Sequence, residues 1–403
     1  MTTTAGDQMP QQNPPHLQRA RLDAITKSGR GEGFRFIQPR NLCWWVYIAI
    51  VAYGAMLTIT MFAAPWHAYA GELGTTIAVL LVYGVVLWWF TRYIDRYSPV
   101  PGSVVLTALV WGAVGATMAI AINANDPIRA LYAKAFGQQF AAEWSAGLTA
   151  PLTEEISKGL GVVLLIYLAP KVIRTAFDGF IVGAFCGLGF QILEDVLYSF
   201  NLAGSHFGAD AGDIGFGVAV QRMLTGLSGH ILFSAIVGAG IVYLLGRPGE
   251  PRNVARGLGF LAIPVAMHWF WDSMGAFLPA PNDAVVMVEL VIVMLVFLAV
   301  VVWVFHLVVG RERRYLRDIL APEVTTGVLT DDELAAVAGD WKQRRRLRKA
   351  AGGHDGRRRE SWVVEAAGDL ADALARSRGA DTPEVEFARS EVTRVRGEVS
   401  INS

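Results

Sequence analysis

Ionisable side chains lie inside long apolar stretches of this sequence, where lipid or a protein core should exclude them. They occur in four consecutive stretches: Glu154, Glu155 and Lys158; Glu194 and Asp195; Arg222 and His230; His268 and Asp272. Such a group costs about 2.5–3.5 kcal/mol at the centre of a membrane. Because that cost is tolerated mainly where the group has a task, these side chains are the first candidates for a functional site.

These side chains provide the parts needed to hydrolyse a peptide bond within or beside a bilayer. A carboxylate beside imidazoles in a dry site can act as a general base toward water. His268 and Asp272 are spaced i, i+4, so they share one helix face and can bind a metal or stabilise an oxyanion. The catalytic candidates are therefore Glu154, Glu155, Lys158, Glu194, His230, His268 and Asp272.

Helical spacing predicts that these side chains meet. Glycines repeat every four residues from Gly179 to Gly187, which indicates a close helix contact, and the same face continues to Glu194. A rise of about 1.5 Å per residue places the acids and imidazoles of the four stretches at overlapping depths. We therefore expect one shared site in the outer half of the membrane.

Spacing leaves two roles open. Lys158 follows Glu154 by four residues and Glu155 by three, so it can pair with either, and either glutamate could be the base. Arg222 lies near the end of its apolar stretch, and we expect its long side chain to extend to the lipid headgroups.

The distribution of charge requires a bilayer around these residues. Lys and Arg number 35 and Asp and Glu 35, and only 26 of these charges lie in residues 41–310. A segment so poor in charge cannot be covered by water, which excludes an ordinary cytosolic enzyme. The net charge of zero excludes a generally basic nucleic-acid binder, so no nucleic-acid partner is expected.

The apolar segments predict an all-α, polytopic integral membrane bundle of about eight transmembrane helices. Each segment has about 20 residues, the length needed to cross the hydrocarbon core. Unbroken runs of this kind favour helices over a membrane barrel. The expected spans are residues 44–64, 73–94, 103–123, 148–168, 176–200, 218–246, 257–277 and 285–309.

Basic residues in the loops predict a multi-pass protein of the plasma membrane with both termini in the cytoplasm. Arg and Lys concentrate in the N-terminal tail, in alternate loops and after the last span, whereas the opposite loops contain mostly acids. An even number of spans agrees with this arrangement. The lipid bilayer is therefore one expected partner.

The two ends are expected to be cytosolic tails around a membrane domain at residues 44–309. Residues 1–43 are expected to be largely disordered, and residues 310–403 to form a partly disordered tail with short helices. Thr330 and Glu333 have the spacing of a capping box, which predicts a helix start. Residues 361–378 could form an amphipathic helix, and residues 342–349 are a basic run.

At the ionisable residues the sequence resembles the PrsW-type intramembrane metalloprotease family, and more distantly the CAAX prenyl-protease type. The family pattern is Glu-Glu-x-x-Lys, Phe-x-x-x-Glu, a histidine, and His-x-x-x-Asp or His-x-x-x-Asn on successive helices. Every motif occurs here in order: Glu154, Glu155 and Lys158; Phe190 and Glu194; His230; His268 and Asp272. The resemblance covers roughly residues 148–277. Family members often have Asn after the second-motif Glu, where this chain has Asp195.

The resemblance implies a membrane-embedded endopeptidase that cleaves membrane proteins or their peptide segments, in bacteria including anti-sigma factors. It also implies a divalent metal, for which carboxylate and histidine ligands favour zinc. The expected ligands are Glu194, His230 and His268, with Asp272 as a further candidate. These residues could instead stabilise the tetrahedral intermediate directly, while Lys158 orients a glutamate.

Two other functions use some of the same residues. A proton-coupled transporter or channel could use buried Glu and His side chains as a relay. The segment from Gly226 to Gly229 resembles the Gly-x-Ser-Gly of rhomboid-type serine proteases, with His268 as a conceivable base. That alternative leaves the glutamates without a role.

Overall fold

A computed structural model describes residues 14–205, 210–278 and 281–397, and in these residues the regular structure is helical, with no strand. The chain forms two compact units. One contains residues Phe34–Val308, and the other combines Met1–Gly33 with Val309–Ser403. Each unit is described by itself below.

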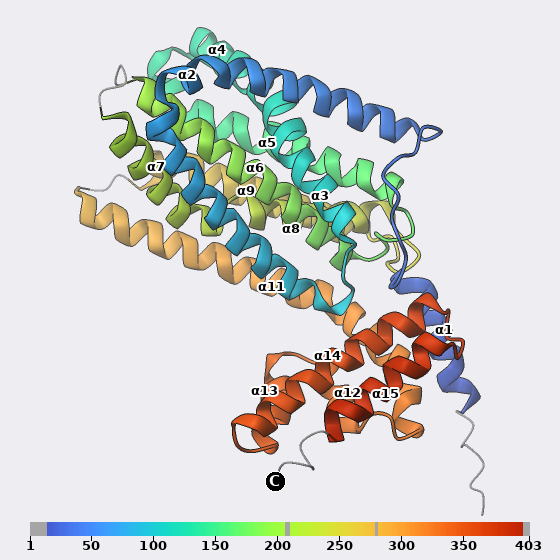
Figure 1. Cartoon of the computed structure of the whole chain (residues 1–403). Helices are drawn as coiled ribbons and strands as arrows, with labels where there is room; N and C mark the ends of the chain where they lie inside the picture. The colour runs from blue at the N-terminus through green and yellow to red at the C-terminus, as the bar shows by residue number, and fades with distance from the viewer. Residues whose placement is uncertain (1–13, 206–209, 279–280, 398–403) are drawn as a thin grey trace, which may run out of the picture. The chain divides into compact units, whose positions relative to one another are not determined.

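The first unit is a bundle of long apolar helices (Figure 1). An α-helical membrane bundle, as predicted, fits this composition. Its elements are α2 (Leu42–Ile94), η1 (Asp95–Tyr97), α3 (Gly102–Val110), η2 (Trp111–Ala121), α4 (Ile122–Phe136), α5 (Gln138–Leu168), α6 (Ala176–Ser205), α7 (Ala211–Thr225), η3 (Gly226–Ser228), α8 (His230–Leu245), α9 (Val254–Asp272), α10 (Met274–Phe277) and the first part of α11 (Asp283–Thr325).

Within the described residues, six helical segments are long and apolar enough to cross a membrane. They are Leu42–Ala68, Gly74–Tyr97, Gly102–Phe136, Ala176–Leu202, Gly212–Leu245 and Asp283–Thr325. The two other expected spans coincide with α5 and α9, which are helical but carry many of the ionisable site residues and are therefore less apolar. The number eight stays a prediction.

Helix α2 contains the first of these segments and most of the second, which continues into η1, and the chain reverses direction between them (Figure 1). Phe62 and Ile77 both pack against Phe200 of α6. In a straight helix, fifteen residues would extend over about 22 Å, too far for both side chains to meet one ring. The two parts of α2 therefore pack as neighbours against α6.

Helices α6 and α8 cross at the glycines that the sequence pattern singled out. A Cβ atom on Gly179 would lie 2.5 Å from the backbone oxygen of Gly238, and one on Gly183 would lie 2.1 Å from that of Ser234. At Gly187 the same atom would lie 2.3 Å from the backbone oxygen of His230. The predicted close contact is confirmed, and it places His230 directly against α6.

A π-helical segment, η2, packs against α5 through Trp111. The buried indole N–H of Trp111 donates to the backbone oxygen of Ser157 at 3.0 Å. Gly161 has no side chain to obstruct the ring, since a Cβ atom there would lie 2.1 Å from the indole. This contact supports α5 within one turn of the predicted glutamates and lysine.

The described residues of the second unit are largely helical. Helix α1 (Pro15–Ser28) packs inside it, and its Arg21 is buried and pairs with Glu323 at 2.7 Å. Arg389 binds the same carboxylate at 2.8 Å. These residues bury charges against each other over long sequence distances. The expected disorder of residues 1–43 and of the C-terminal tail stays a prediction, and residues 1–13 and 398–403 lie outside the described residues.

The remaining helices of this unit follow the local sequence signals. They are α12 (Asp331–Val337), α13 (Trp341–Ala350), α14 (His354–Arg376) and α15 (Pro383–Gly397). The capping box of Thr330 and Glu333 is confirmed at the start of α12. The amphipathic segment expected at residues 361–378 is part of α14, which begins earlier.

Candidate functional site

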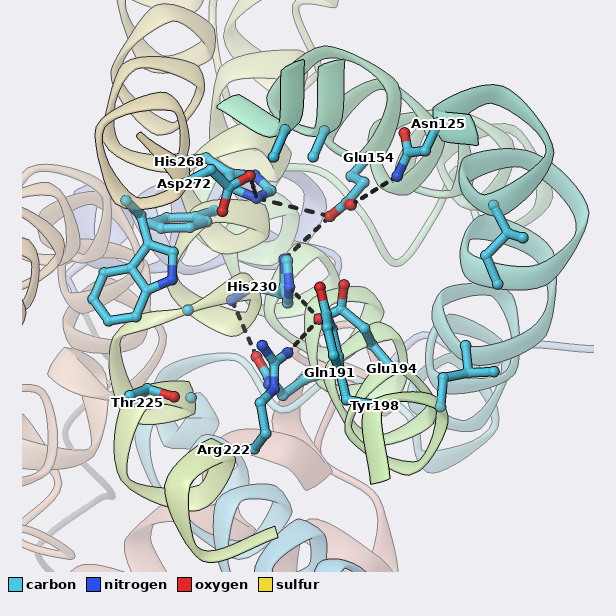
Figure 2. A pocket seen from close by; sticks show the side chains of 18 of the residues that line it. Asn125, Glu154, Gln191, Glu194, Tyr198, Arg222, Thr225, His230, His268 and Asp272 are labelled. Atoms are coloured by element: carbon cyan, nitrogen blue, oxygen red, sulfur yellow. Dashed lines mark hydrogen bonds and ion pairs between the residues drawn. The ribbon is translucent and has the colours of Figure 1, made fainter. Parts of the chain in front are cut away.

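A cavity of about 360 Å³ lies inside the first unit and collects most of the predicted residues (Figure 2). Its volume is within the range of small-ligand sites, enough for a short segment of peptide. Its polar lining comes from helices α4 to α9 and includes Asn125, Glu154, Glu194, Arg222, His230, His268 and Asp272. Phe233 and Trp271 add apolar walls. The residues expected to share a site are therefore close together.

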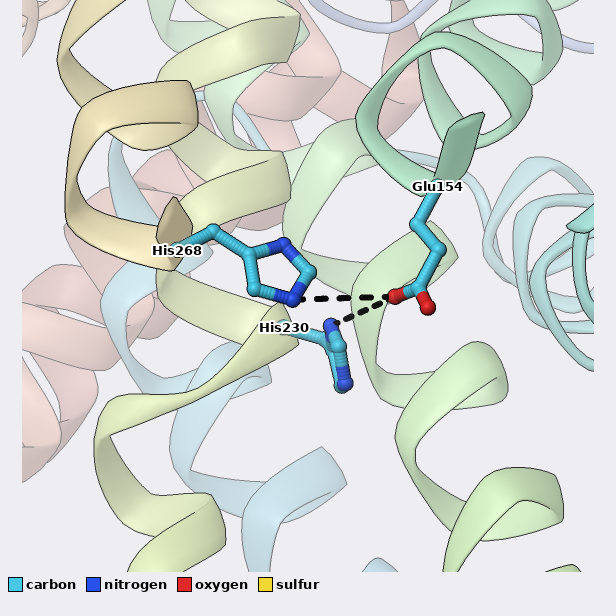
Figure 3. Close-up of side chains that lie close together, drawn as sticks. All are labelled: Glu154, His230 and His268. Carbon is cyan, nitrogen blue, oxygen red and sulfur yellow. Dashed lines mark ion pairs between the residues drawn. The ribbon is translucent and has the colours of Figure 1, made fainter. Parts of the chain in front are cut away.

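Glu154 is the glutamate that faces the cavity. Its side chain is buried, and Oε1 accepts a hydrogen bond from the Asn125 amide at 3.2 Å. Oε2 has no hydrogen-bond donor within the described residues. It lies 3.7 Å from His230 Nδ1 and 3.8 Å from His268 Nε2 (Figure 3). One oxygen is therefore held, and the other is directed at the two imidazoles.

Asn125 is a site residue that the sequence analysis missed. It lies on α4, outside the four motif helices, and the hydroxyl of Thr153 donates to its side-chain oxygen. Because that oxygen accepts from Thr153, the amide nitrogen must point toward Glu154. The available signal was weak: a polar residue just beyond the expected third span, outside the depth at which the other site residues were expected.

Glu155 lies behind the cavity wall and is not among the lining residues. It pairs with Lys158 at 2.7 Å, and its Oε1 also lies 3.1 Å from Nδ1 of His268. Lys158 is 3.9 Å from Glu154 and is fully buried, with the Phe190 ring 4.4 Å from its ammonium. Glu155 and Lys158 thus form a buried pair that orients His268.

The contacts of His230 define which of its ring nitrogens carries the proton. Nδ1 lies 2.9 Å from the Lys158 ammonium, which can only donate, so Nδ1 accepts. The proton is then on Nε2, which donates to Glu194 Oε2 at 2.9 Å. His230 therefore connects the Lys158 side of the site to the Glu194 side.

A break in the sixth predicted span places His230 at a helix start. The chain leaves the helix at η3, and Gly229 precedes the first residue of α8. Gln191 bridges the break, because its side-chain oxygen accepts from the His230 backbone N–H at 3.4 Å and its amide donates to Asp195 at 2.8 Å. Backbone groups freed inside a membrane need such a partner.

Arg222 binds the two acids of α6, which corrects the expectation that it extends to the headgroups. It forms ion pairs with Glu194 and, at 2.5 Å, with Asp195. Asp195 is fully buried, so the departure from Asn in the family pattern introduces a second charge that Arg222 balances. A buried and a half-buried carboxylate attract the guanidinium more strongly than the membrane surface does.

The donor atoms around Glu154 suit a cation. Glu155 accepts the proton of His268 Nδ1, so His268 Nε2 presents a lone pair, 3.4 Å from Asp272 and 3.8 Å from Glu154. Glu154, His230 and His268 each offer one ligand atom within 4.8 Å of the others. The free oxygen of Glu154 and the lone pair of His268 Nε2 fit a divalent metal, and His230 Nδ1 could join them only in place of its contact with Lys158. Glu194, an expected ligand, lies outside this group because Arg222 and His230 Nε2 hold its carboxylate.

The serine-protease alternative gains no support. The hydroxyl of Ser228 donates to the backbone oxygen of Thr225 at 3.1 Å. In the described part of the chain it forms no hydrogen bond with His268. A serine nucleophile needs a base within hydrogen-bond reach.

Comparison with known proteins agrees with the geometry. The model of the PrsW family of intramembrane metalloproteases matches residues 100–304, a region that includes every residue of the cavity described above except Met61. The searches of curated proteins and of solved structures gave no match. The chain therefore belongs to the PrsW family of intramembrane metalloproteases.

Proposed function

We propose that this protein is a membrane-embedded endopeptidase that hydrolyses peptide bonds of membrane-protein substrates, with Glu154 as the base that activates water. The observation that carries the proposal is the free oxygen of Glu154. It is buried, faces the cavity and lies within 4 Å of both site histidines. A water molecule bound next to this oxygen could donate its proton to Glu154 and would lie beside the imidazoles of His230 and His268.

In this mechanism Glu154 removes a proton from water as the oxygen attacks the scissile carbonyl carbon. The carbon–nitrogen bond then breaks, and the same proton passes from Glu154 to the departing amine. Asn125 holds the other oxygen of Glu154, which keeps the basic oxygen directed at the cavity. Glu155 and Lys158 keep His268 and His230 in their orientations.

The residues that would hold a metal are Glu154, His230 and His268, with Asp272 next to His268. When bound there, a divalent cation such as zinc supplies Lewis acidity toward the scissile carbonyl. Without a metal, His268 could instead be protonated and donate an N–H to the oxygen of the tetrahedral intermediate.

The loop charges support a location in the plasma membrane with both termini in the cytoplasm. With this orientation the cavity opens in the outer half of the bilayer. Substrates would be membrane proteins with a segment that unfolds near that surface, and anti-sigma-factor-like proteins are one such class.

The decisive experiment compares Glu154→Gln with the wild-type protein, both reconstituted in nanodiscs with a membrane-protein substrate. Glu154→Gln keeps the size of the side chain but removes the base, so cleavage should fall by at least about 100-fold. Glu143→Gln is the matched control, because Glu143 lies on the same helix but is exposed and outside the cavity. Its cleavage rate should equal that of the wild type.

Metal analysis of the same samples separates the roles of Glu154. If Glu154→Gln keeps its metal content but loses cleavage, Glu154 acts only as the base. If the variant loses both metal and cleavage, Glu154 is also a metal ligand. Full cleavage by Glu154→Gln would refute the proposed mechanism. Proton flux in liposomes that depends on Glu154, without any peptide cleavage, would favour a transporter.

A further inference from the structure

A strongly basic cleft lies in the second unit, where α13 meets the start of α14. Its volume is about 450 Å³. Its lining consists of six basic residues and a serine, with no acid: Arg345, Arg348, Lys349, His354, Arg357, Arg358 and Ser361. We refer to this feature as the basic cleft. It is separate from the protease cavity, and the proposed hydrolysis does not use it.

The local structure explains why these side chains gather. Arg345, Arg348 and Lys349 are spaced i, i+3 and i+4, so they share one face of α13. Gly352 and Gly353 both have positive φ angles, 65° and 49°, and turn the chain so that the first turn of α14 returns toward that face. The basic run at residues 342–349 therefore forms one side of the cleft, and the start of α14 forms the other side.

Most cations of the basic cleft have no acidic partner. In the described residues, Arg345, Arg348, Lys349 and Arg357 form no ion pair. Of the acids nearest in sequence, Asp355 contacts His354 of the lining at 3.4 Å, and Glu360 contacts Arg359, outside the lining, at 3.8 Å.

Other arginines of this unit do pair with acids. Arg394 contacts Glu391 at 2.9 Å, and Arg396 contacts Glu333 at 2.7 Å. Since like charges repel, a cluster of neighbouring unpaired cations favours binding of an external anion.

The basic side chains of the cleft favour phosphate as the ligand. The continuous helix that joins the cleft to the first unit favours the phosphate groups of lipids. The planar guanidinium group of arginine can donate two parallel hydrogen bonds to phosphate oxygens, and its positive charge complements theirs. Helix α11 is continuous from the first unit into the second, so the cleft is tethered to a membrane and meets headgroups at high effective concentration. Trp341, exposed at the start of α13, is a residue typical of membrane interfaces.

We propose that the basic cleft docks the second unit on the membrane surface by binding the phosphate groups of anionic phospholipids. Each basic side chain near an anionic leaflet strengthens such binding about fivefold. The reversal of three of them should therefore weaken docking by about 100-fold or more. Binding should also weaken as salt is added, because the cleft is open to solvent.

The test uses the full-length protein in nanodiscs of phosphatidylcholine, with or without phosphatidylglycerol, and measures hydrogen exchange of residues 341–361. Exchange should be slower in the anionic nanodiscs, and high salt should remove the difference. The triple variant Arg345→Glu, Arg348→Glu, Arg357→Glu should show no difference between the two lipids. The matched control reverses three exposed arginines outside the cleft: Arg19, Arg376 and Arg378. It has the same net charge and should behave as the wild type.

Exchange in the buried parts of α14 and α15 shows whether each variant is folded. If the glutamate variant unfolds, the corresponding three-glutamine variant replaces it. Equal exchange in the two lipids, or loss of the effect in the control variant, would overturn the proposal. Equal protection by inorganic phosphate in phosphatidylcholine nanodiscs would also overturn it, since it would assign the cleft to soluble phosphates. Protection by RNA but not by anionic lipid would overturn it in favour of nucleic acid.

Discussion

Residue scale: Glu154 and Glu155 are adjacent in sequence and chemically identical, but they occupy different environments. Glu154 lines the cavity with one free oxygen, whereas Glu155 is paired with Lys158 behind the wall. A helix turns about 100° per residue, so neighbouring side chains point in different directions. Which direction leads into the cavity depends on the helices around α5, and the sequence spacing to Lys158 does not contain that information.

Asn125 provides a residue-scale test of how the base is held. Asn125→Ala removes the hydrogen bond to Glu154, so we expect kcat to fall about 10- to 150-fold, which corresponds to about 1.5–3 kcal/mol for a bond to a charged group. KM should change little because the substrate need not contact Asn125. The measurement is steady-state cleavage in nanodiscs.

Asn123→Ala is the matched control for Asn125, because Asn123 lies on the same helix and donates to the helix backbone. Its kcat should equal the wild-type value. Equal losses in the two variants would show that α4 acts only through its stability. Asn125→Asp should be worse than Asn125→Ala, since it places a second carboxylate against Glu154.

Arg222 provides a residue-scale test of stability. Arg222→Leu leaves Glu194 and Asp195 buried without their cation, and we expect a loss of about 3–5 kcal/mol in the free energy of unfolding. Arg222→Lys should recover part of it, because one ammonium cannot reproduce both contacts of the guanidinium. Thermal unfolding in detergent measures the stability of the two variants relative to the wild type. A Leu variant as stable as the wild type would contradict the ion pairs described here.

Element scale: the crossing of α6 and α8 positions His230, and it depends on the absence of side chains. At Gly183 an added methyl group would meet a backbone oxygen, which cannot move as a flexible side chain can. The helices would have to separate, and His230 would move away from Glu194 and Glu154. The glycine repeat was readable in the sequence because small residues every four positions have one main use in membrane helices.

Gly183→Ala tests this crossing. We expect a loss of about 1–3 kcal/mol in stability from overpacking, together with reduced cleavage. Gly259→Ala is the control, because Gly259 is also inside a helix of the bundle but has open space around it. Alanine favours the helix there by up to about 1 kcal/mol, so stability should stay equal or rise. Equal destabilisation by both substitutions would show that helix propensity, and not packing, decides the effect.

Whole-molecule scale: the second unit joins the two ends of the chain through buried charges. Glu323 accepts from Arg21 and Arg389, which come from helices at opposite ends of the sequence. Burial lowers the pKa of Arg21, and the neighbouring Glu323 opposes that change by stabilising the charged guanidinium. Without this carboxylate, the buried Arg21 of α1 would lose its ion pair and keep only its hydrogen bond to the backbone oxygen of Ile319.

Glu323→Gln is therefore expected to destabilise the second unit by about 3–5 kcal/mol. Hydrogen exchange in α1, α14 and α15 should rise, while the membrane bundle keeps its protection because it is a separate compact unit. Glu386→Gln, at an exposed position of α15, is the control and should leave exchange unchanged. Protection of α1 that survives in Glu323→Gln would contradict the described role of the carboxylate.

The sequence by itself determined the class of the protein, the membrane bundle, the motif residues and the glycine crossing. Each of these depends on local pattern: apolar length, periodicity, and polar groups that lipid should exclude. Even the capping box of α12 was a local signal.

Only the tertiary structure decided which glutamate faces the cavity, which nitrogen of His230 carries the proton, and that Arg222 turns inward. It also joined α1 to residues 309–403 and folded α13 against α14 to form the basic cleft. These features depend on contacts between residues far apart in the chain. The free energy of such a contact depends on which residues the fold brings together. The local sequence around one residue does not identify its tertiary partner.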